Sequence, residues 1–392
     1  MMVKLKDICS KIGSGATPRG GKETYCDNGI SLVRSQNVLD FEFTDSGLAH
    51  INDEQASKLS NVEVIDGDVL INITGDSVAR VCKMDAAFLP ARVNQHVAIV
   101  RGEKDKVLSS YILYYLQMMK GHLLQLASAG ATRNALTKGM LEQLELELPD
   151  IETQMRITSV LDSFQEKIAL NRKINDNLYE MVNAYYTSLF KESDCEMTTV
   201  GNYAERIYSG GTPMTSNAAY WNGTFGWFSS GETRNRFVIS TEKTITQAGI
   251  DNSSTKLATK YDIVMASAGQ GFTRGQTSML LIDTYVNQSV IVIKSEKNIL
   301  PYLFWNLANR YDELRAISDS SSIRGSLTTK MIAAFEIPLA NEQSLQAFAD
   351  FAWSVIPQIE NNLLENERLT ALRDSLLPKL MSGEIDVSDI QL

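Results

Sequence analysis

The sequence of 392 residues has few of the features that mark secreted, membrane or metal-dependent proteins. Its four cysteines form no CxxC pair, which favours reduced, structural thiols over a disulfide framework. No apolar run approaches the roughly 20 residues that a membrane span needs, and no apolar signal core follows the first residues. We therefore expect a cytoplasmic protein that contacts no membrane.

Signatures of catalysis are also missing. The three histidines are isolated, and none has a partner at metal-ligand spacing. Gly269, Gly271 and Gly275 have the wrong spacing for a dinucleotide fingerprint, and Gly21-Lys22-Glu23 lacks the remaining residues of a P-loop. The sequence contains no Asn-Pro-Pro-Tyr tetrad of the kind found in methylases. It therefore predicts no metal site, no catalytic residues and no cofactor bound by this chain.

The net charge of -10 argues at first against binding to nucleic acid, but it is unevenly placed. Residues 341–392 carry nine carboxylates and only three basic groups, so the preceding residues are closer to neutral and can carry local basic patches. An acidic chain binds phosphate backbones weakly by itself. We expect a basic partner to share any contact with nucleic acid.

The most informative positive feature is an internal duplication. Gly15-Ala16-Thr17-Pro18 recurs as Gly210-Gly211-Thr212-Pro213. Further matches follow at slowly shrinking offsets: Tyr25 with Tyr220, Asp68 with Asp262, Arg80 with Arg274, Asn94-Gln95 with Asn287-Gln288, Tyr111 with Tyr302, Arg133 with Arg324, and Leu136 with Leu327. A repeat of this length is a domain plus a connector, so the chain is a tandem duplication. A duplicated domain suggests two similar targets bound at once.

Each repeat divides into a lobe and an arm. In residues 1–150 and 192–340, short apolar runs such as Asp68–Thr74 alternate with Gly, Asn and Asp, which predicts strands. Helical patterns follow at Ser110–Met119 and Pro301–Ala308, and their aromatic and methionine side chains are typical of a core. Each lobe is therefore predicted to be α+β.

The arms, residues 151–191 and 341–392, have apolar positions spaced by alternating steps of four and three, as in a coiled coil. The positions in the first arm are Ile157, Leu161, Phe164, Ile168, Asn171, Asn175, Leu178, Val182, Tyr185 and Leu189. Those in the second arm are Phe348, Ala352, Val355, Ile359, Asn362, Asn366, Leu369, Arg373, Leu376 and Leu380. The expected fold class is α+β, with two repeated domains joined by two long helices that form an antiparallel coiled coil.

Two asparagines interrupt this apolar seam at the same place in both arms. An asparagine in a seam lowers stability but specifies register, since a slipped helix leaves its amide unpaired. An antiparallel pairing predicts Asn171 against Asn366 and Asn175 against Asn362. A parallel pairing would place Asn171 against Asn362, and a third possibility is that both asparagine pairs face solvent.

The arms have the length of a spacer. A paired arm of about 33 residues would extend about 50 Å, enough to hold two lobes over half-sites about one turn of B-DNA apart. Pro357 lies inside the second arm. We expect a kink there, or a helix that restarts with this proline in its first turn.

The repeated Gly-x-Thr-Pro, the Asn-Gln pairs, the long arm after each lobe and the ending Asp374–Ile385 together resemble the specificity subunit of type I restriction-modification systems. The resemblance covers essentially the whole chain. It implies a non-catalytic, sequence-specific DNA-recognition subunit. Residues 1–150 and 192–340 would be two target recognition domains, each for one half of an asymmetric bipartite site. Residues 151–191 would be a central helical arm, and 341–392 a C-terminal arm and tail.

The same resemblance implies partners and cofactors. The paired arms would set the gap between the half-sites and dock two methylase subunits. Two restriction/translocase subunits would complete the complex on double-stranded DNA. S-adenosylmethionine, ATP and magnesium would be used by those other subunits and not by this chain.

Recognition of bases requires loop side chains such as Arg, Asn, Gln, Ser and Asp, because these match the hydrogen-bonding edges of base pairs. Three loop sets recur in both lobes and supply the predicted DNA-binding residues. In the first lobe these are Arg34, Ser35, Gln36, Thr74, Asp76, Ser77, Arg80, Thr132 and Arg133. In the second lobe they are Ser230, Glu232, Arg234, Arg236, Ser267, Gln270, Arg274, Ser322 and Arg324. The loops differ in composition, so the lobes should recognise different bases. Arg234 and Arg236 beside Glu232 favour guanine and cytosine.

Structural roles are open for several of these residues. Arg80 and Arg274 could be paired with carboxylates of the scaffold, whereas Arg133 and Arg324 precede helix-like segments and suit an anion near a helix N-terminus. The Asn-Gln pairs precede strands, where an amide network in a turn explains them as well as DNA contact does. Gly-x-Thr-Pro is typical of a turn.

Two functions of other classes are compatible with the sequence. A stand-alone DNA-modifying or DNA-cleaving enzyme would need a cryptic active site without a recognisable motif. A coiled-coil scaffold with no DNA role would suit an acidic chain. Such a scaffold would show no salt-dependent DNA binding, even with its partner present.

Overall fold

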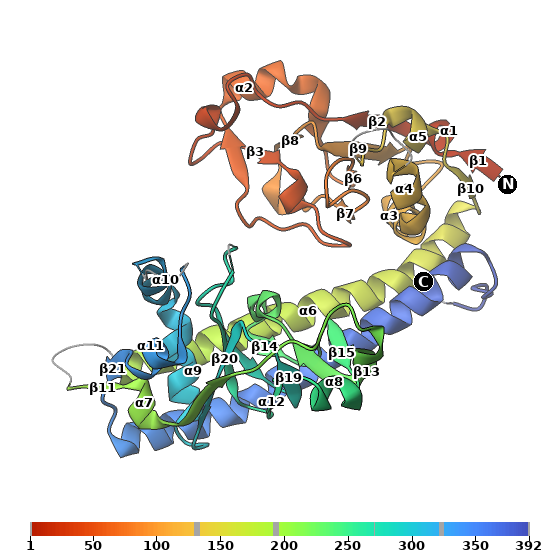
Figure 1. Cartoon of the computed structure of the whole chain (residues 1–392). Helices are drawn as coiled ribbons and strands as arrows, with labels where there is room; N and C mark the ends of the chain where they lie inside the picture. Colours follow the sequence, from red (N-terminus) through yellow and green to blue (C-terminus); the bar gives the residue numbers. More distant parts are fainter. Residues whose placement is uncertain (1, 129–133, 191–195, 270, 321–324, 391–392) are drawn as a thin grey trace. The chain divides into compact units, whose positions relative to one another are not determined.

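The computed structural model describes residues 2–128, 134–190, 196–269, 271–320 and 325–390. They fall into two compact units. Unit 1 contains Met1–Ile168 and Arg368–Leu392, and unit 2 contains Ala169–Glu367. Each unit therefore consists of one lobe and one segment of each of the two long helices (Figure 1).

Short strands form the first lobe, residues 1–150, which is coloured red to yellow in Figure 1. They are β1 (Met2–Lys4), β2 (Cys9–Ser14), β3 (Ile30–Val33), β4 (Ala49–Ile51), β5 (Glu63–Val64), β6 (Val69–Asn72), β7 (Val81–Lys83), β8 (Ala91–Val93), β9 (Val97–Gly102) and β10 (Glu145–Glu147). Their sheets have the orders β1-β10, β2-β9-β6-β7 and β4-β3-β8-β5. The pairing of β3 with β8 is parallel, and the others are antiparallel.

Helices and 3-10 turns complete this lobe. The helices are α1 (Leu5–Ile8), α2 (Asp53–Lys58), α3 (Ser109–Met118), α4 (Lys120–Ser128) and α5 (Lys138–Glu142). The 3-10 turns are η1 (Gly21–Thr24), η2 (Ser35–Asn37), η3 (Ser60–Val62) and η4 (Ala86–Phe88).

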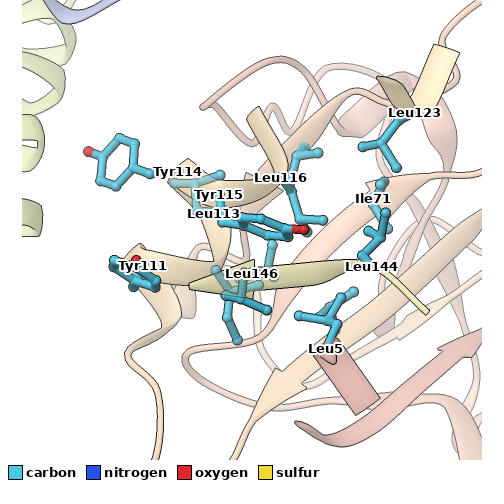
Figure 2. Close-up of a cluster of buried hydrophobic side chains, with 14 of the residues drawn as sticks. Leu5, Ile71, Tyr111, Leu113, Tyr114, Tyr115, Leu116, Leu123, Leu144 and Leu146 are labelled. Atoms are coloured by element: carbon cyan, nitrogen blue, oxygen red, sulfur yellow. The ribbon is translucent and has the colours of Figure 1, made fainter. Parts of the chain in front are cut away.

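The aromatic helix α3 lies in the core of the first lobe. Figure 2 shows its Leu116 near Ile71, and Tyr111, Tyr115 and Leu116 belong to one buried cluster with Leu5 and Ile71, which come from other elements of the lobe. The tyrosine hydroxyl groups of α3 are hydrogen-bonded. Tyr111 donates to the carbonyl of Glu147 at 3.1 Å, and Tyr115 donates to the carbonyl of Glu145 at 2.9 Å. Burial raises the pKa of both tyrosines to about 12. The prediction that this run belongs to the core is confirmed.

The second lobe, residues 192–340, repeats this architecture. Its strands are β11 (Met197–Thr199), β12 (Ala204–Ser209), β13 (Trp221–Phe228), β14 (Phe237–Val238), β15 (Lys243–Ile245), β16 (Lys256–Ala258), β17 (Ile263–Ala266), β18 (Thr277–Leu280), β19 (Thr284–Val286), β20 (Val290–Ser295) and β21 (Glu336–Pro338). Its helices and 3-10 turns are α7 (Val200–Tyr203), α8 (Gln247–Asp251), α9 (Leu300–Asn309), α10 (Tyr311–Ser320), α11 (Thr329–Ala333), η5 (Ala218–Tyr220) and η6 (Ser230–Arg234).

The sheet orders of the second lobe, β11-β21, β12-β20-β17-β18-β14 and β15-β13-β19-β16, correspond strand for strand to those of the first. Strand β14 adds one edge strand, and β13 pairs with β19 in parallel, as β3 pairs with β8. Each lobe is α+β, as predicted, and the repeat found in the sequence is a repeat of the fold.

A buried carboxylate recurs at the start of the corresponding strands β6 and β17. Asp68 is fully buried, and its two oxygens accept hydrogen bonds from Nε and Nη2 of Arg101, each at 2.7 Å. Asp262 accepts a hydrogen bond from the backbone N–H of Thr259 at 2.7 Å and lies 3.4 Å from Nζ of Lys294. Desolvation raises the pKa of Asp262, because its effect exceeds that of these favourable partners. These matched residues belong to the scaffold.

The two long helices are α6 (Ile151–Leu189) and α12 (Glu342–Met381), and both are continuous. Helix α12 passes through Pro357 without a break, so the prediction that a helix restarts there is wrong. Pro357 lies on the exposed face of α12. Its ring therefore displaces no core side chain, and water can replace the lost backbone hydrogen bond.

Within unit 2 the two helix segments run antiparallel, side by side (Figure 1). Asn171 donates from Nδ2 to Oδ1 of Asn366 at 2.9 Å, and Asn362 donates from Nδ2 to Oδ1 of Asn175 at 2.8 Å. Asn171 also donates to Glu365 Oε2 at 2.7 Å. These are the pairs that the antiparallel arrangement predicts, and they exclude the parallel and solvent-facing alternatives.

Within unit 1 the seam position Arg373 of α12 holds a buried cation. Its guanidinium lies 3.8 Å from the ring centroid of Phe41, in the first lobe, and its Nη1 donates to Oε1 of Gln165 on α6 at 2.8 Å. Asp374 supplies the countercharge at 2.7 Å. The surrounding apolar positions are buried with the lobe core: Ile157, Leu161, Leu377 and Leu380.

Replacing Asn171 by leucine should destabilise unit 2 by about 1–3 kcal/mol, because Asn366 loses a buried hydrogen bond. The double variant Asn171→Leu/Asn366→Leu should recover part of this loss, since two leucines need no pairing, while Glu365 still lacks the donor that Asn171 supplied. Thermal unfolding followed by circular dichroism measures both. Asn177→Leu, at an exposed position of α6, controls for helix propensity. Equal losses in the single and double variants would contradict the coupling.

Candidate nucleic-acid interface

Two of the loop sets predicted from the sequence meet in the first lobe around one hollow of about 820 Å³, here called the first-lobe hollow. Its lining residues are Ser35, Gln36, Thr74, Gly75, Asp76, Ser77, Arg80, His96, Asn134 and Ala135. Residues 35–37 form η2, and residues 73–80 connect β6 with β7. Side chains separated by about 40 residues in the sequence therefore share one concave surface.

Buried Asn72 holds these two loops together. Its Nδ2 lies within hydrogen-bonding distance of the carbonyl of Ser35, at 2.9 Å, and of Oγ of Ser77, at 3.2 Å. The second loop turns at Gly75 and Ala79, both with positive φ. The backbone N–H of Gly75 donates to the carbonyl of Asn134 at 3.3 Å, so the segment before α5 is also tied to the hollow. The scaffold thus presents the lining side chains in a defined arrangement.

His96 also lines the hollow, although no sequence motif involves it. Its Nδ1 lies 2.7 Å from Oγ1 of Thr74, and its Nε2 lies 3.2 Å from Nε2 of Gln95. Oδ1 of Asn94 accepts the backbone N–H of His96 at 3.0 Å, and Asn287 does the same for Ser289 at 2.9 Å. The turn interpretation of the Asn-Gln pairs is therefore confirmed for their asparagines. This repeated turn is the signal that could have drawn attention to His96.

Arg80 is the cation of the first-lobe hollow. It is half-buried, and within the described part of the chain its guanidinium has no hydrogen bond or ion pair with the protein. The alternative of a salt bridge to the scaffold therefore does not describe Arg80. Exposed Asp76 provides an acceptor, while Thr74 and Ser77 provide hydroxyl groups. A guanidinium suits a phosphate or a guanine, and hydroxyl and carboxylate groups suit the edges of bases.

Two other predicted residues of this lobe contact the loop at residues 46–47. Arg34 donates to the carbonyl of Gly47 and lies 5.5 Å from the ring centroid of Tyr25. Gln36 is exposed and donates to the carbonyl of Ser46 at 3.3 Å. Gln36 remains available at the rim of the hollow, whereas Arg34 supports the loop behind it.

The second lobe differs at the positions that correspond to this hollow. Arg274, the counterpart of Arg80, is buried, pairs with Asp319, and donates from Nη1 to the carbonyl of Gly325 at 2.6 Å. The salt-bridge alternative is therefore confirmed for Arg274. Ser267 is buried too, and its carbonyl accepts the N–H of Leu327 at 2.8 Å. We correct the prediction for both residues, because neither presents its side chain to a DNA surface.

Glu232 is a second correction. Only 4% of its surface is exposed. Its Oε1 accepts the backbone N–H of Ser229 at 2.7 Å, and its Oε2 accepts that of Glu242 at 2.8 Å. Asn37, at the corresponding place in the first lobe, accepts the N–H of Arg34 at 3.0 Å. Glu232 therefore satisfies backbone donors of its own loop and has no free edge for a cytosine.

The other predicted residues of that loop are accessible. Arg234 is exposed and paired with Glu242, an exposed pair of a kind that contributes little and can be exchanged for a phosphate or a base. Ser230 is half-buried. Arg236 lies against α6, with its guanidinium 4.2 Å from the Tyr179 ring centroid and 3.6 Å from Asp176. Arg234 and Ser230 are therefore the better placed candidates in this loop.

The remaining predicted residues lie outside the described part of the chain: Thr132, Arg133, Gln270, Ser322 and Arg324. Among the described residues, no cluster of three or more His, Cys, Asp or Glu side chains could hold a metal ion. Over the same residues, no helix is long and apolar enough to cross a membrane.

Comparison with known proteins accords with this repeated arrangement. The protein-family model for the type I restriction modification DNA specificity domain matches the chain twice, over residues 1–180 and 192–367. The EcoR124I/EcoR124II specificity subunit of Escherichia coli is 26% identical over 260 residues, which is 63% of this chain and of that subunit. The match thus spans less than two thirds of that relative. The MjaIX specificity subunit of Methanocaldococcus jannaschii is 22% identical over 412 residues, 99% of this chain and 94% of the relative.

The fold has a counterpart among solved structures. The S subunit of a type I restriction-modification system from M. genitalium matches 97% of this chain and 96% of its own, with a TM-score of 0.58 at 14% identity. The chain belongs to the type I restriction modification DNA specificity domain family and contains the domain in both of its lobes. It is of the class of type I specificity subunits, with two target recognition domains, as the resemblance in the sequence implies.

Arg80→Ala should weaken DNA binding and lower the slope of log K against log salt by about 0.9 if one phosphate contact is lost. Anisotropy titrations of a labelled duplex at salt concentrations between about 50 and 200 mM measure both the affinity and the slope, because phosphate contacts respond over this range. Lys58→Ala, which removes an exposed cation of α2, is the control. An unchanged affinity and slope for Arg80→Ala would remove this residue from the interface.

Proposed function

We propose that this chain is the non-catalytic DNA-recognition subunit of a type I restriction-modification complex, and that each lobe recognises one half of an asymmetric bipartite site. The observation that carries the proposal is the repeat itself. Corresponding strands of the two lobes hold loops of different composition, such as Thr74–Arg80 in the first lobe and Ser267–Arg274 in the second. One scaffold with two different surfaces suits two different half-sites.

In the first lobe, the first-lobe hollow supplies the contacts, with Arg80 for phosphate or guanine and with Gln36, Asp76 and Ser77 for base edges. In the second lobe, Ser230 and Arg234 are the accessible polar candidates. These assignments rest on exposure and side-chain chemistry. The acidic composition of the whole chain supports a division of labour, in which partner subunits supply much of the affinity for the phosphate backbone.

The partners in this proposal are double-stranded DNA, methylase subunits and restriction/translocase subunits. Two of each subunit would suit a chain with two repeated domains. S-adenosylmethionine, ATP and magnesium would be bound by those other subunits. The relatives named above are specificity subunits of type I restriction enzymes, which supports a role in such an assembly.

An exposed apolar stripe on α6 in unit 2 is the proposed docking surface for a methylase subunit. Leu170, Ile174 and Met181 are 52%, 37% and 46% exposed. Spacings of four and seven residues place the three side chains within about 40° of one another around the helix. Apolar side chains in a row on an exposed helical face are typical of a surface that packs against a partner helix.

The function is tested by sequencing the methylome of a host that lacks adenine methylation and expresses this chain with the methylase subunit of its own locus. A new bipartite motif should appear and should vanish when the chain is omitted. Exchanging residues 192–340 for those of another family member should change one half of the motif alone. Stable complexes without a modified motif would favour a scaffold. Methylation by this chain alone would favour an enzyme.

The docking surface is tested with Leu170→Asp and Ile174→Asp. Each should lower the affinity of the chain for the methylase subunit by tenfold or more, about 1.4 kcal/mol, because a carboxylate is desolvated in the contact. Isothermal titration calorimetry measures the affinity. Leu124→Asp, at a comparably exposed position of α4 in the first lobe, is the control. Equal affinities for all three variants would place the contact elsewhere.

A further inference from the structure

One large apolar side chain stands out within the described residues of the second lobe. Phe272 is 86% exposed, and the next most exposed large apolar residue there is Met214 at 65%. Phe272 lies in the connection between β17 and β18, which corresponds to the β6–β7 loop of the first-lobe hollow. Its counterpart in the first lobe is Val78, which is buried. The same loop position therefore points inward in one lobe and outward in the other.

The backbone around Phe272 is held in place from α10. Arg315 donates from Nη1 to the carbonyl of Gly271 at 2.7 Å, and the hydroxyl of Tyr311 donates to the carbonyl of Phe272 itself at 2.6 Å. The loop closes where the N–H of Gly275 donates to the carbonyl of Ala266 at 2.9 Å. Two side chains of one helix thus anchor the segment that carries the ring. A ring on an anchored segment loses little conformational freedom when it binds a partner.

The surroundings of the ring supply no competing partner among the described residues. The ring contacts of the second lobe do not involve Phe272, and at this exposure both of its faces are open to water. The neighbouring Arg274 is buried against Asp319, and Arg315 is paired with the same carboxylate. Among the described residues of this part of the loop, the aromatic ring is therefore the principal accessible group, where the first lobe presents Thr74, Asp76 and Arg80.

We propose that Phe272 inserts between bases of the half-site bound by the second lobe and stacks on a base step as an apolar wedge. The proposal rests on the proposed function. Insertion covers both faces of the ring, whereas contact with a thymine methyl group in the groove would cover little more than an edge. The stacking of bases on the ring offsets the cost of opening one step.

Insertion would contribute to sequence specificity through the flexibility of the DNA. Pyrimidine–purine steps such as TA and CA unstack at the lowest cost, so they are the steps expected next to Phe272. The first lobe would then recognise its half-site by polar contacts in the first-lobe hollow, and the second lobe would combine polar contacts with a deformed step. This is a difference in mechanism between the lobes as well as in the bases recognised.

The test uses the complete chain in complex with its methylase subunit and a duplex that carries the motif found by methylome sequencing. Phe272→Ala should bind this duplex about 5- to 150-fold more weakly than the unsubstituted chain, the range for loss of stacking on one base. Phe272→Leu, which keeps an apolar wedge without the ring, should lie between the two. Permanganate oxidation of thymines reports unstacking. Reactivity at a step of the second half-site should rise with the unsubstituted chain and fall with Phe272→Ala.

Phe225→Ala is the matched control, because it removes another exposed phenylalanine of the same lobe, on β13 outside this loop. Phe272→Ala and Phe272→Leu should melt at the same temperature as the unsubstituted chain, since the ring of Phe272 supports no core. Equal affinity of Phe272→Ala and the unsubstituted chain would overturn the proposal, and so would weaker binding with an unchanged permanganate pattern. If the unsubstituted complex modifies no motif and binds no duplex, the proposed function fails and the wedge fails with it.

Discussion

The hydrogen-bonded asparagine pairs between α6 and α12 are the constraint on which unit 2 depends. An apolar seam alone tolerates sliding by a helical turn, because one leucine replaces another at little cost. Asn171 is fully buried and donates to Asn366, so any slip leaves an amide without its partner in an apolar layer. The register also places Tyr179 and Tyr186 of α6 in the core that contains Trp305 and Tyr302. The core of the second lobe therefore contains side chains of α6, so its packing depends on the register of the two helices.

Much of this architecture can be predicted from the sequence because it depends on periodicity, which is local. The heptad spacing of the arms, the short strands and the aromatic helices α3 and α9 all follow from the alternation of apolar and polar residues. The duplication adds a second, independent copy of each signal. The asparagine register was predictable for a related reason: two polar positions that recur at the same place in two helices have few mutually consistent pairings.

The loops were harder, because residues of the same types serve the scaffold and the surface. Glu232 and Arg234 are two positions apart, yet one accepts buried backbone hydrogen bonds and the other is exposed. Arg80 and Arg274 match in the sequence but differ in burial, since Asp319 and Gly325 engage Arg274 in the second lobe. Such partners come from distant segments, which a local pattern does not identify. Phe272 was not among the predicted contacts, because only polar side chains of this loop were considered for the recognition of base edges.

Asn37 and Glu232 each accept a backbone N–H group of their own loop, an arrangement called here the brace. The brace bears on how new specificities arise. Glu232 also accepts the N–H of Glu242, ten residues further along the chain. A recombination event that imports only the few exposed residues of such a loop would separate the brace from its backbone donors. An event that exchanges the stretch from Ser229 to Glu242 imports the carboxylate together with its backbone donors. Natural diversification of this family should therefore proceed by transfer of whole braced segments, with their boundaries in the strands and not in the loops.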